Sequence, residues 1–451
     1  MRTEFSEAQL ADPAMAASER AIRKCVHCGF CTATCPTYVL LGDERDSPRG
    51  RIAMIQDMLE HERVPSAETV RHVDRCLSCL SCKTTCPSGV NYPHLIDHAR
   101  AWIETHYRRP GHERLLRTVL AQVLPFPRRF RAALRLAALG RPFAGLLERV
   151  PATRPLAAML RLAPRRLPKS APPQALAGDE KGRVVLLQGC AEPVLKSEIR
   201  AATQRLLARA GYRVELVAGE QCCGALVRHM GRDEDSLAAA RRNVDVWTRE
   251  MARGIEAIIV TASGCGTTIK DYGTMLAHDP AYAAKAARVS ALACDISEFL
   301  ARIDLPEGGA GGLRVAYQSA CSLQHGQSID REPRALLERA GYQVLIPAEA
   351  HLCCGSAGTY NIMQPAIAGR LRDRKLAHLE ALHPDVIATG NIGCAMQLSG
   401  ASTVPVVHVV ELLDWATGGP PPAALASSMP QAGTATFPAS HSPKSALARS
   451  V

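Results

Sequence analysis

Residues 25–38 read CVHCGFCTATCPTY, and residues 76–92 read CLSCLSCKTTCPSGVNY. Each stretch places three cysteines three residues apart and a fourth cysteine four residues further on, directly before a proline. The cysteines are Cys25, Cys28, Cys31 and Cys35 in the first stretch, and Cys76, Cys79, Cys82 and Cys86 in the second. Four thiols in one short run, repeated once, indicate two sets of ligands rather than ordinary core packing.

This is the spacing of bacterial [4Fe–4S] motifs, in which three thiolates bind one cluster and the fourth ligates the other. We therefore predict two [4Fe–4S] clusters, the role of which is to relay electrons. The predicted ligand sets are Cys25, Cys28, Cys31 and Cys86 for the first cluster, and Cys76, Cys79, Cys82 and Cys35 for the second. Thiolates also suit zinc, but zinc sites typically use separated pairs of cysteines.

The composition sets the broad class. With 451 residues, 47% of them hydrophobic, the chain can bury a substantial core. Its seventeen cysteines are an odd number and stand in clusters, which favours metal ligation in a reducing compartment over a disulfide framework. The first residues lack an apolar segment behind basic residues, and no stretch of about 18 apolar residues occurs, so we expect neither signal peptide nor membrane span. These features predict a cytoplasmic protein.

The positive charge is concentrated in one segment. Residues 107–170 contain 15 Lys and Arg but only two acids, Glu113 and Glu148, whereas the whole chain has a net charge of +11. Such a segment suits contact with anionic lipid at the inner face of the cytoplasmic membrane, contact with an acidic partner subunit, or a solvated helical connector. No nucleic-acid-reading module is recognisable, so we expect no nucleic-acid partner.

A second repeat fills the C-terminal half. Cys190, Cys222, Cys223 and Gly224 recur 131 residues later as Cys321, Cys353, Cys354 and Gly355, and Cys265 recurs 129 residues later as Cys394. The first copy predicts strands at 183–187, 213–217 and 257–260 and helices at 197–210 and 236–252, a βαβαβ unit. Because the loops that follow parallel strands lie along one sheet edge, the four cysteines of each copy should meet there.

These patterns predict an α/β protein with an α-rich, ferredoxin-like N-terminal domain and a C-terminal pair of repeated βαβαβ modules. The predicted segments are an N-terminal segment (1–20), the two-cluster domain (21–105), a basic helical linker (106–180), the two Cys-Cys-Gly modules (181–302 and 303–418) and a Pro-, Ala- and Ser-rich tail (419–451). The composition of the tail predicts disorder.

The chemistry of the Cys-Cys-Gly cysteines is less narrowly determined. Such cysteines can ligate iron, form a redox disulfide, or pack as small apolar side chains. The matching placement in two copies favours a site for a further iron–sulfur cluster. The predicted cofactor-binding residues are Cys190, Cys222, Cys223 and Cys265 in the first module, and Cys321, Cys353, Cys354 and Cys394 in the second.

Together with SPRGRI at 47–52, TASGCG at 261–266 and HLCCGSAGTY at 351–360, the cysteine motifs resemble the glycolate oxidase (glycolate dehydrogenase) iron–sulfur subunit family over residues 5–416. The repeats are similar to heterodisulfide reductase modules, in which such cysteines bind an unusual cluster. The resemblance implies an electron-transfer subunit working with a FAD-binding catalytic subunit and a second flavin-type subunit. Those partners would oxidise glycolate to glyoxylate, and the electrons would pass to a quinone-type acceptor. We expect no catalytic residues on this chain.

The modules depart from the heterodisulfide reductase pattern. Thr268 and Gln397 occupy the positions where a closing C-x-x-C would place its second cysteine, and Cys294 has Val407 as its counterpart, so we expect Cys294 to be structural. We interpret four histidines near the repeat in the same way: His229, His325, His351 and His408. The alternative functions are an iron–sulfur subunit of a lactate or glycerol-3-phosphate dehydrogenase, and a heterodisulfide-reductase-like thiol–disulfide enzyme.

Overall fold

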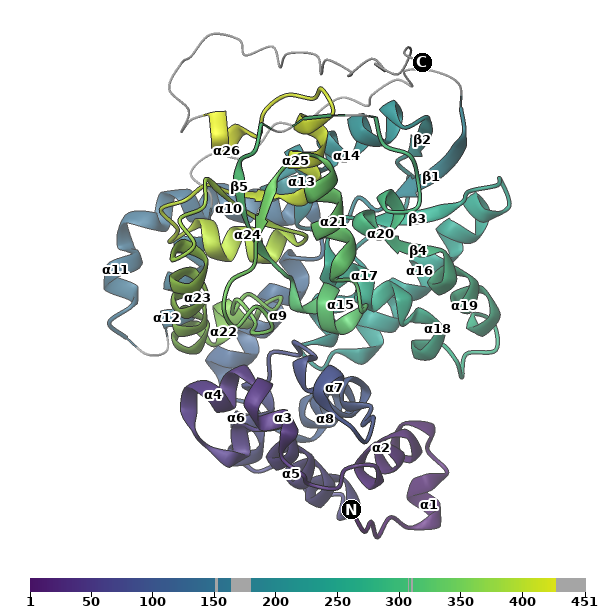
Figure 1. The fold of residues 1–451 in the computed structure, drawn as a ribbon. Helices are drawn as coiled ribbons and strands as arrows, with labels where there is room; N and C mark the ends of the chain where they lie inside the picture. The colour runs from purple at the N-terminus through teal and green to yellow at the C-terminus, as the bar shows by residue number, and fades with distance from the viewer. Residues whose placement is uncertain (151–152, 164–179, 307, 310, 427–451) are drawn as a thin grey trace, which may run out of the picture.

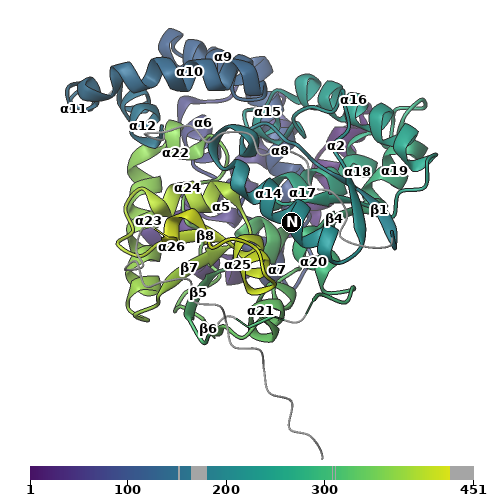
Figure 2. The same cartoon turned by 90° about the horizontal axis from the view of Figure 1, so that it is seen from above.

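The computed structural model describes residues 1–150, 153–163, 180–306, 308–309 and 311–426. A helical N-terminal domain lies beneath two α/β modules that stand side by side, and a helical arm runs along one side of the modules (Figures 1 and 2). This arrangement confirms the predicted fold class, with an α-rich region followed by two parallel-sheet modules.

The N-terminal domain is built from short helices around the two cysteine motifs. Ile22, Ile55, Leu59 and Ile96 form part of its buried core. The elements are α1 (Glu7–Leu10), α2 (Pro13–Arg23), α3 (Phe30–Thr34), α4 (Pro36–Leu41), the 3-10 helix η1 (Glu44–Asp46), α5 (Pro48–Glu60), α6 (Ala67–Asp74), α7 (Ser81–Thr85) and α8 (Tyr92–His106).

Each module is a four-stranded, fully parallel sheet, in the order β2-β1-β3-β4 in the first and β6-β5-β7-β8 in the second. The sequence predicts the first three strands of each module, but the short fourth strand was not predicted. The first module comprises β1 (Gly182–Leu186), α13 (Glu192–Leu195), α14 (Ser197–Arg209), β2 (Tyr212–Glu215), α15 (Ala225–Arg228), α16 (Asp233–Met251), β3 (Ala257–Val260), α17 (Ser263–Lys270), α18 (Tyr272–Met275), α19 (Ala283–Leu292), β4 (Ala293–Asp295) and α20 (Ile296–Leu300).

The second module repeats this order with its own helix lengths. It comprises β5 (Arg314–Gln318), the π-helical turn η4 (Ser322–Gly326), α21 (Arg331–Arg339), β6 (Gln343–Leu345), α22 (Tyr360–Met363), α23 (Pro365–Glu380), β7 (Val386–Thr389), α24 (Ile392–Ser399), β8 (Val406–His408), α25 (Val409–Ala416) and α26 (Ala423–Ala426). Cys294 lies in the middle of β4 and Val407 in the middle of β8, so both occupy the same place in their sheets.

The two modules share one hydrophobic core. Val184 and Leu186 of β1 pack into a cluster that also contains Val315 and Tyr317 of β5, while Val185 faces a separate cluster on the other side of its sheet. Strands buried on both faces explain the nearly continuous apolar runs in the sequence. The modules therefore form one body, and their cysteine-bearing edges are held in a fixed relation.

The N-terminal domain contacts both modules through polar side chains. Arg228 Nε of the first module donates to Asp97 Oδ2 at 2.8 Å, and Tyr360 Oη of the second module donates to the carbonyl of Arg75 at 3.0 Å. Thr84 also hydrogen-bonds with His325 at 2.8 Å. These contacts place the two cysteine motifs against the modules.

The arm contains α9 (Gly111–Val123), α10 (Pro127–Gly140), the 3-10 helix η2 (Arg141–Phe143), α11 (Ala144–Leu147) and α12 (Arg154–Leu162). The end of the predicted basic linker, 164–179, and most of the predicted tail, 427–451, lie outside the described residues. Among the residues that are described, no helix is both long and apolar enough to cross a bilayer.

Candidate functional site: four clusters of thiols

The first N-terminal site, called site 1, is a cavity lined by Cys25, Cys28, Cys31 and Cys86. The fourth of these cysteines comes from the second motif, as the ligand assignment requires. In both motifs the chain makes the same tight turn, because His27 and Ser78 have φ of 53° and 51°, and Gly29 has φ of 86°. This turn points three closely spaced thiols toward one centre.

The second N-terminal site, called site 2, is a neighbouring cavity lined by Cys35, Cys76, Cys79 and Cys82. Cys82, Pro48 and Tyr92 line both cavities, so the two sites share a wall. The structure thus brings together the two predicted sets of four cysteines, each completed by the other motif. Site 2 is buried at all four cysteines, whereas Cys28 of site 1 is exposed.

The donor set of both sites fits iron–sulfur ligation. All seventeen thiols of the chain are free of disulfide bonds. Burial raises the pKa of Cys31 to about 11, and burial together with neighbouring thiols raises the pKa of Cys79 and Cys82 well above the ordinary value. Four thiolates this close together need a positively charged centre among them, and soft thiolates select iron–sulfur clusters or zinc.

The first module brings its four predicted cysteines into a row, called quartet 1. Cys190 follows β1, Cys222 and Cys223 follow β2, and Cys265 lies in the first turn of α17 after β3. Hydrogen bonds link Cys190 to Cys222 and Cys223 to Cys265. The pKa of Cys222 is lowered because both Cys190 and Cys223 donate to it, so this sulfur carries the negative charge most readily.

The second module forms the corresponding quartet 2. The Sγ atoms of Cys321 and Cys353 lie 3.7 Å apart, and those of Cys354 and Cys394 lie 3.2 Å apart. Here the hydrogen bonds of Cys354 with Cys353 and Cys394 lower its pKa. The ends of the parallel strands thus bring these cysteines together, as the sequence predicted.

The glycine of each Cys-Cys-Gly motif is required by the backbone. Gly224 and Gly355 have φ of 88° and 86°, a left-handed conformation that favours glycine. An added Cβ on Gly355 would lie 2.5 Å from the carbonyl oxygen of Ala368 in α23. The motif therefore lets the paired cysteines turn sharply while a helix packs directly against them.

Thr268 and Gln397, which depart from the heterodisulfide reductase pattern, have structural hydrogen-bond partners, and so does His408. Thr268 Oγ1 donates to the carbonyl of Gly264 at 3.2 Å, and Gln397 Nε2 donates to the carbonyl of Ala368 at 3.3 Å. His408 caps α25, where its Nδ1 accepts from the amide of Val410 at 3.2 Å. These residues stabilise the fold around the quartets.

Quartet 2 lies next to site 2. Cys79 and Cys353 belong to one packed cluster with Leu77 and Tyr360, and Cys321 packs against it. The nearness of Cys321 contributes to the raised pKa of Cys79. A hydrogen bond of 2.7 Å between Ser263 and Ser322 joins the turns that carry quartets 1 and 2. Sites 1 and 2 and the quartets therefore form a continuous series of thiol clusters.

Sequence reasoning missed the charged side chains around these clusters. Arg49 lines site 1 and Arg51 lines site 2, and Lys375 lies beside quartet 2. The SPRGRI string that contains both arginines was noted only as a point of resemblance. Two arginines so close to a cysteine motif were the available signal.

Models of two protein families match the chain. The 4Fe-4S dicluster domain matches residues 21–90, and the cysteine-rich domain matches twice, over residues 184–270 and 315–399. A solved structure of a hypothetical protein from Helicobacter pylori covers 94% of this chain and 75% of its own, with a TM-score of 0.53 and 11% identity, which shows the fold alone. The fold and the thiol clusters thus define an iron–sulfur protein in which a two-cluster domain precedes paired cysteine-rich modules.

The relatives narrow this class. The chain is 43% identical to the glycolate oxidase iron-sulfur subunit of Escherichia coli, over 92% of this chain and 99% of the relative. It is 31% identical to the probable glycolate oxidase iron-sulfur subunit of Bacillus subtilis, over 89% of this chain and 95% of the relative. The chain belongs to the glycolate oxidase iron–sulfur subunit family, as its motifs predicted.

Proposed function

We propose that this chain relays electrons for a glycolate-oxidising complex, from a flavin partner to a quinone-type acceptor. The observation that carries this proposal is the sorting of the eight N-terminal cysteines into two adjoining cavities, the second of which abuts quartet 2. When bound there, [4Fe–4S] clusters supply one-electron exchange without proton transfer. The side chains of this chain hold the thiols, exclude water from site 2 and fix the order of the sites.

The partners in this proposal are a FAD-binding catalytic subunit, which oxidises glycolate to glyoxylate, and a second flavin-type subunit. Site 1 is the end of the series that reaches the surface, since Cys28 is exposed and is flanked by exposed Val26 and Phe30. An exposed apolar rim beside a redox site suits a partner interface. Substrate chemistry then belongs to the flavin subunit.

The test compares ligand variants with a matched control in the assembled complex. Cys28→Ser and Cys79→Ser should each remove one cluster signal and stop acceptor reduction, while glycolate still reduces the flavin of the partner. Cys294→Ser is the control, because Cys294 is buried in β4 outside all four thiol clusters; it should retain both signals. Full acceptor reduction in the Cys28 and Cys79 variants would contradict the proposal, and turnover of lactate or glycerol 3-phosphate in place of glycolate would reassign the substrate.

We also propose that the arm rests on the inner face of the cytoplasmic membrane. Its exposed side chains include large apolar residues and arginines, and the described residues 111–163 contain only two acids, Glu113 and Glu148. The apolar ones are Leu136, Leu139, Phe143, Leu146, Val150 and Leu156, and the arginines are Arg128, Arg129, Arg135, Arg149, Arg154 and Arg161. Basic helices with an apolar surface bind anionic lipid, at about 1 kcal/mol for each Arg near the bilayer.

The membrane proposal is tested by sedimentation with vesicles. The protein should bind vesicles that contain phosphatidylglycerol more tightly than vesicles of phosphatidylcholine alone, and Arg128→Glu with Arg129→Glu should weaken that binding. Equal binding of wild type and variant to both kinds of vesicle would contradict it. The cytoplasmic placement agrees with seventeen unpaired thiols, which a reducing compartment preserves.

A further inference from the structure

Helix α5 begins between sites 1 and 2 and carries an arginine for each. Arg49 lines the cavity of site 1, and Arg51 lines the cavity of site 2. Between them, Gly50 packs so tightly that an added Cβ would lie 2.0 Å from the carbonyl oxygen of Glu44. Cations in the first positions of a helix oppose the helix dipole, and no acid balances them within that turn. Such a departure from local preference points to function.

Arg51 is held rigidly against the ligands of site 2. Its side chain is 1% exposed, its Nε donates to the carbonyl of His72 at 2.7 Å, and its Nη2 donates to Thr37 Oγ1 at 3.0 Å. Its Nη1 lies 3.9 Å from the Sγ of Cys35. Burial alone would lower the pKa of Arg51, but neighbouring anionic groups, Cys76 first among them, raise it above the ordinary value. The guanidinium therefore stays charged.

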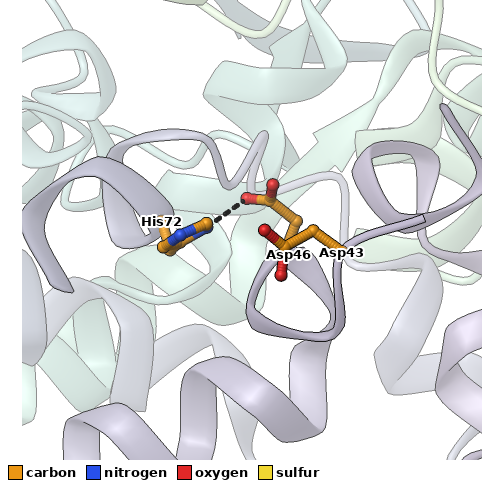
Figure 3. A group of neighbouring side chains, drawn as sticks. All are labelled: Asp43, Asp46 and His72. Atoms are coloured by element: carbon orange, nitrogen blue, oxygen red, sulfur yellow. Dashed lines mark hydrogen bonds and ion pairs between the residues drawn. The ribbon is translucent and has the colours of Figure 1, made fainter. Parts of the chain in front are cut away.

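The carboxylate behind Arg51 does not cancel its charge. Asp46 is fully buried and hydrogen-bonds with His72 Nδ1 at 2.9 Å. Figure 3 shows this contact, with Asp43 nearby. Asp46 also pairs with Arg51 at 3.3 Å and with Arg75 at 2.8 Å. The three side chains in the figure are spaced for a metal ion, but two guanidiniums already occupy the oxygens of Asp46. One carboxylate shared by two guanidiniums leaves net positive charge beside site 2.

Arg49 is arranged differently at site 1. Its Nε donates to Glu44 Oε1 at 2.6 Å and its Nη1 to the carbonyl of His27 at 3.1 Å. The side chain is 32% exposed, so Glu44 and solvent both reduce the effect of its charge. The two arginines are two residues apart on one helix. Arg51 differs from Arg49 because its side chain is 1% exposed and the carboxylate it pairs with is shared with Arg75, so more of its charge acts on its site.

The difference matters because the two sites differ in their access to water. All four cysteines of site 2 are buried, so an added electron there cannot be stabilised by solvent. Cluster potentials depend on net charge, on hydrogen bonds to sulfur and on exposure. We propose that Arg51 is the fixed counter-charge of site 2, which raises its reduction potential above the value that burial alone would give. This inference rests on the proposed function, in which both sites hold [4Fe–4S] clusters.

The proposed step balances without further reactants. With clusters held by the cysteines of the two sites, one electron would pass from site 1 to site 2, and no bond would be made or broken. Arg51 stays protonated throughout, so the transfer needs no proton. Without the charge of Arg51, the buried site 2 would become harder to reduce than site 1, and the electrons would remain at site 1.

The test is a redox titration of the full chain that is monitored by EPR. It compares the wild type with Arg51→Gln and with the matched control Arg49→Gln. Arg51→Gln should lower the midpoint potential of one cluster by at least about 59 mV. For a one-electron couple this corresponds to a tenfold fall in the ratio of reduced to oxidised cluster. The shifted cluster should be the one whose signal Cys79→Ser removes. Arg49→Gln should move only the other cluster, and by less. Arg51→Lys, which keeps a positive charge, should show a smaller fall in that potential than Arg51→Gln.

The inference is overturned if Arg51→Gln keeps its full iron content and both midpoint potentials are unchanged. Should that variant lose iron, Thr37→Val provides the second test, because it removes one anchor of Arg51 and a hydroxyl 3.3 Å from the Sγ of Cys35. It should lower the same potential by a smaller amount, and no shift would overturn the inference. Wild-type protein without two clusters would instead contradict the proposed function.

Discussion

The two modules have the same strand order and the same four cysteines, but their quartets stand in different surroundings. Beside quartet 2, the buried ammonium of Lys375 donates to the carbonyls of Glu349 and Ala350 at 2.8 and 3.3 Å. On the matching helix of the first module, the neutral Asn243 donates to the carbonyl of Cys222 at 3.2 Å. Duplication kept the positions of the thiols, while the charge around them diverged.

The neighbours of the quartets differ as well. Quartet 2 abuts site 2 through Cys321 and Cys353. Quartet 1 instead has two acids close by in the chain: Glu192, which is buried and follows Cys190 by two residues, and Glu220, which is partly buried and precedes Cys222 by two residues. Burial raises the pKa of both carboxyls to about 7. A cation stabilises added negative charge, whereas a protonated carboxyl gives no such stabilisation and an ionised one opposes the charge. Quartet 2 is therefore the one suited to take electrons from the N-terminal domain.

The largest effect expected from this asymmetry is on electron transfer. Loss of an outer-shell partner at a metal site typically costs about 10–100-fold in activity. Cys321→Ser should reduce acceptor turnover by at least this much. Cys190→Ser, at the matching position of quartet 1, should reduce it less. Steady-state reduction of a quinone analogue by the assembled complex, with glycolate as donor, measures both. Equal losses in the two variants would show that the quartets are equivalent.

A second difference concerns the pH dependence of stability. Asp295 and His408 cap helices α20 and α25 at the same place in the two modules, each with a glutamate three residues on. Burial raises the pKa of Asp295 to about 7 and lowers the pKa of His408 to about 4. Folded Asp295 keeps a proton that the unfolded chain loses above about pH 4, so its contribution to stability falls as pH rises to about 7.

His408 acts in the opposite direction. The unfolded chain gains a proton on this histidine below about pH 6.5, while the folded chain gains it only near pH 4, so stability falls on acidification through that window. Asp295→Asn should therefore remove one of the contributions that lower stability as pH rises, so the variant should lose less stability than the wild type between pH 5 and pH 8. It should stabilise the protein at pH 8 by a few kcal/mol at most, at about 1.4 kcal/mol per pH unit. Urea midpoints at the two pH values test this, and a variant with the pH dependence of the wild type would refute it.

The smallest effect concerns one contact between the modules. Asp414, 1% exposed on α25, pairs with Arg205 and Arg209 of α14, whose side chains are each 23% exposed. Ala301 stands at the matching place after α20, so this ion pair exists on one side only. Asp414→Asn should destabilise the module pair by about 2 kcal/mol, because the usual cost of breaking a buried pair is reduced by the exposure of the arginines.

That loss is measured as the shift in the urea midpoint of unfolding. The unfolding is monitored by the fluorescence of Trp247 and Trp415, which lie in the module pair. Ala301→Ser is the control and should change the stability by less than about 0.5 kcal/mol. An Asp414→Asn variant as stable as the control would show that the ion pair does not contribute.

The sequence predicted those features that depend on local spacing or on strand ends. The crossed ligand sets follow from two short motifs, and the quartets follow from the rule that parallel strands end at one edge. The fourth strands were missed because β4 and β8 have three residues each, too few for a periodic pattern. Arg51 and Lys375 were missed because their roles depend on burial and on neighbours distant in sequence, which only the folded chain shows.

The most direct test of the account is the iron and acid-labile sulfide content of anaerobically purified protein, together with EPR of its reduced form. Two [4Fe–4S] clusters require about eight irons and eight sulfides per chain, with two interacting signals, and a larger content would show that the quartets also bind metal. A colourless protein, or one that contains zinc in place of iron, would contradict the account.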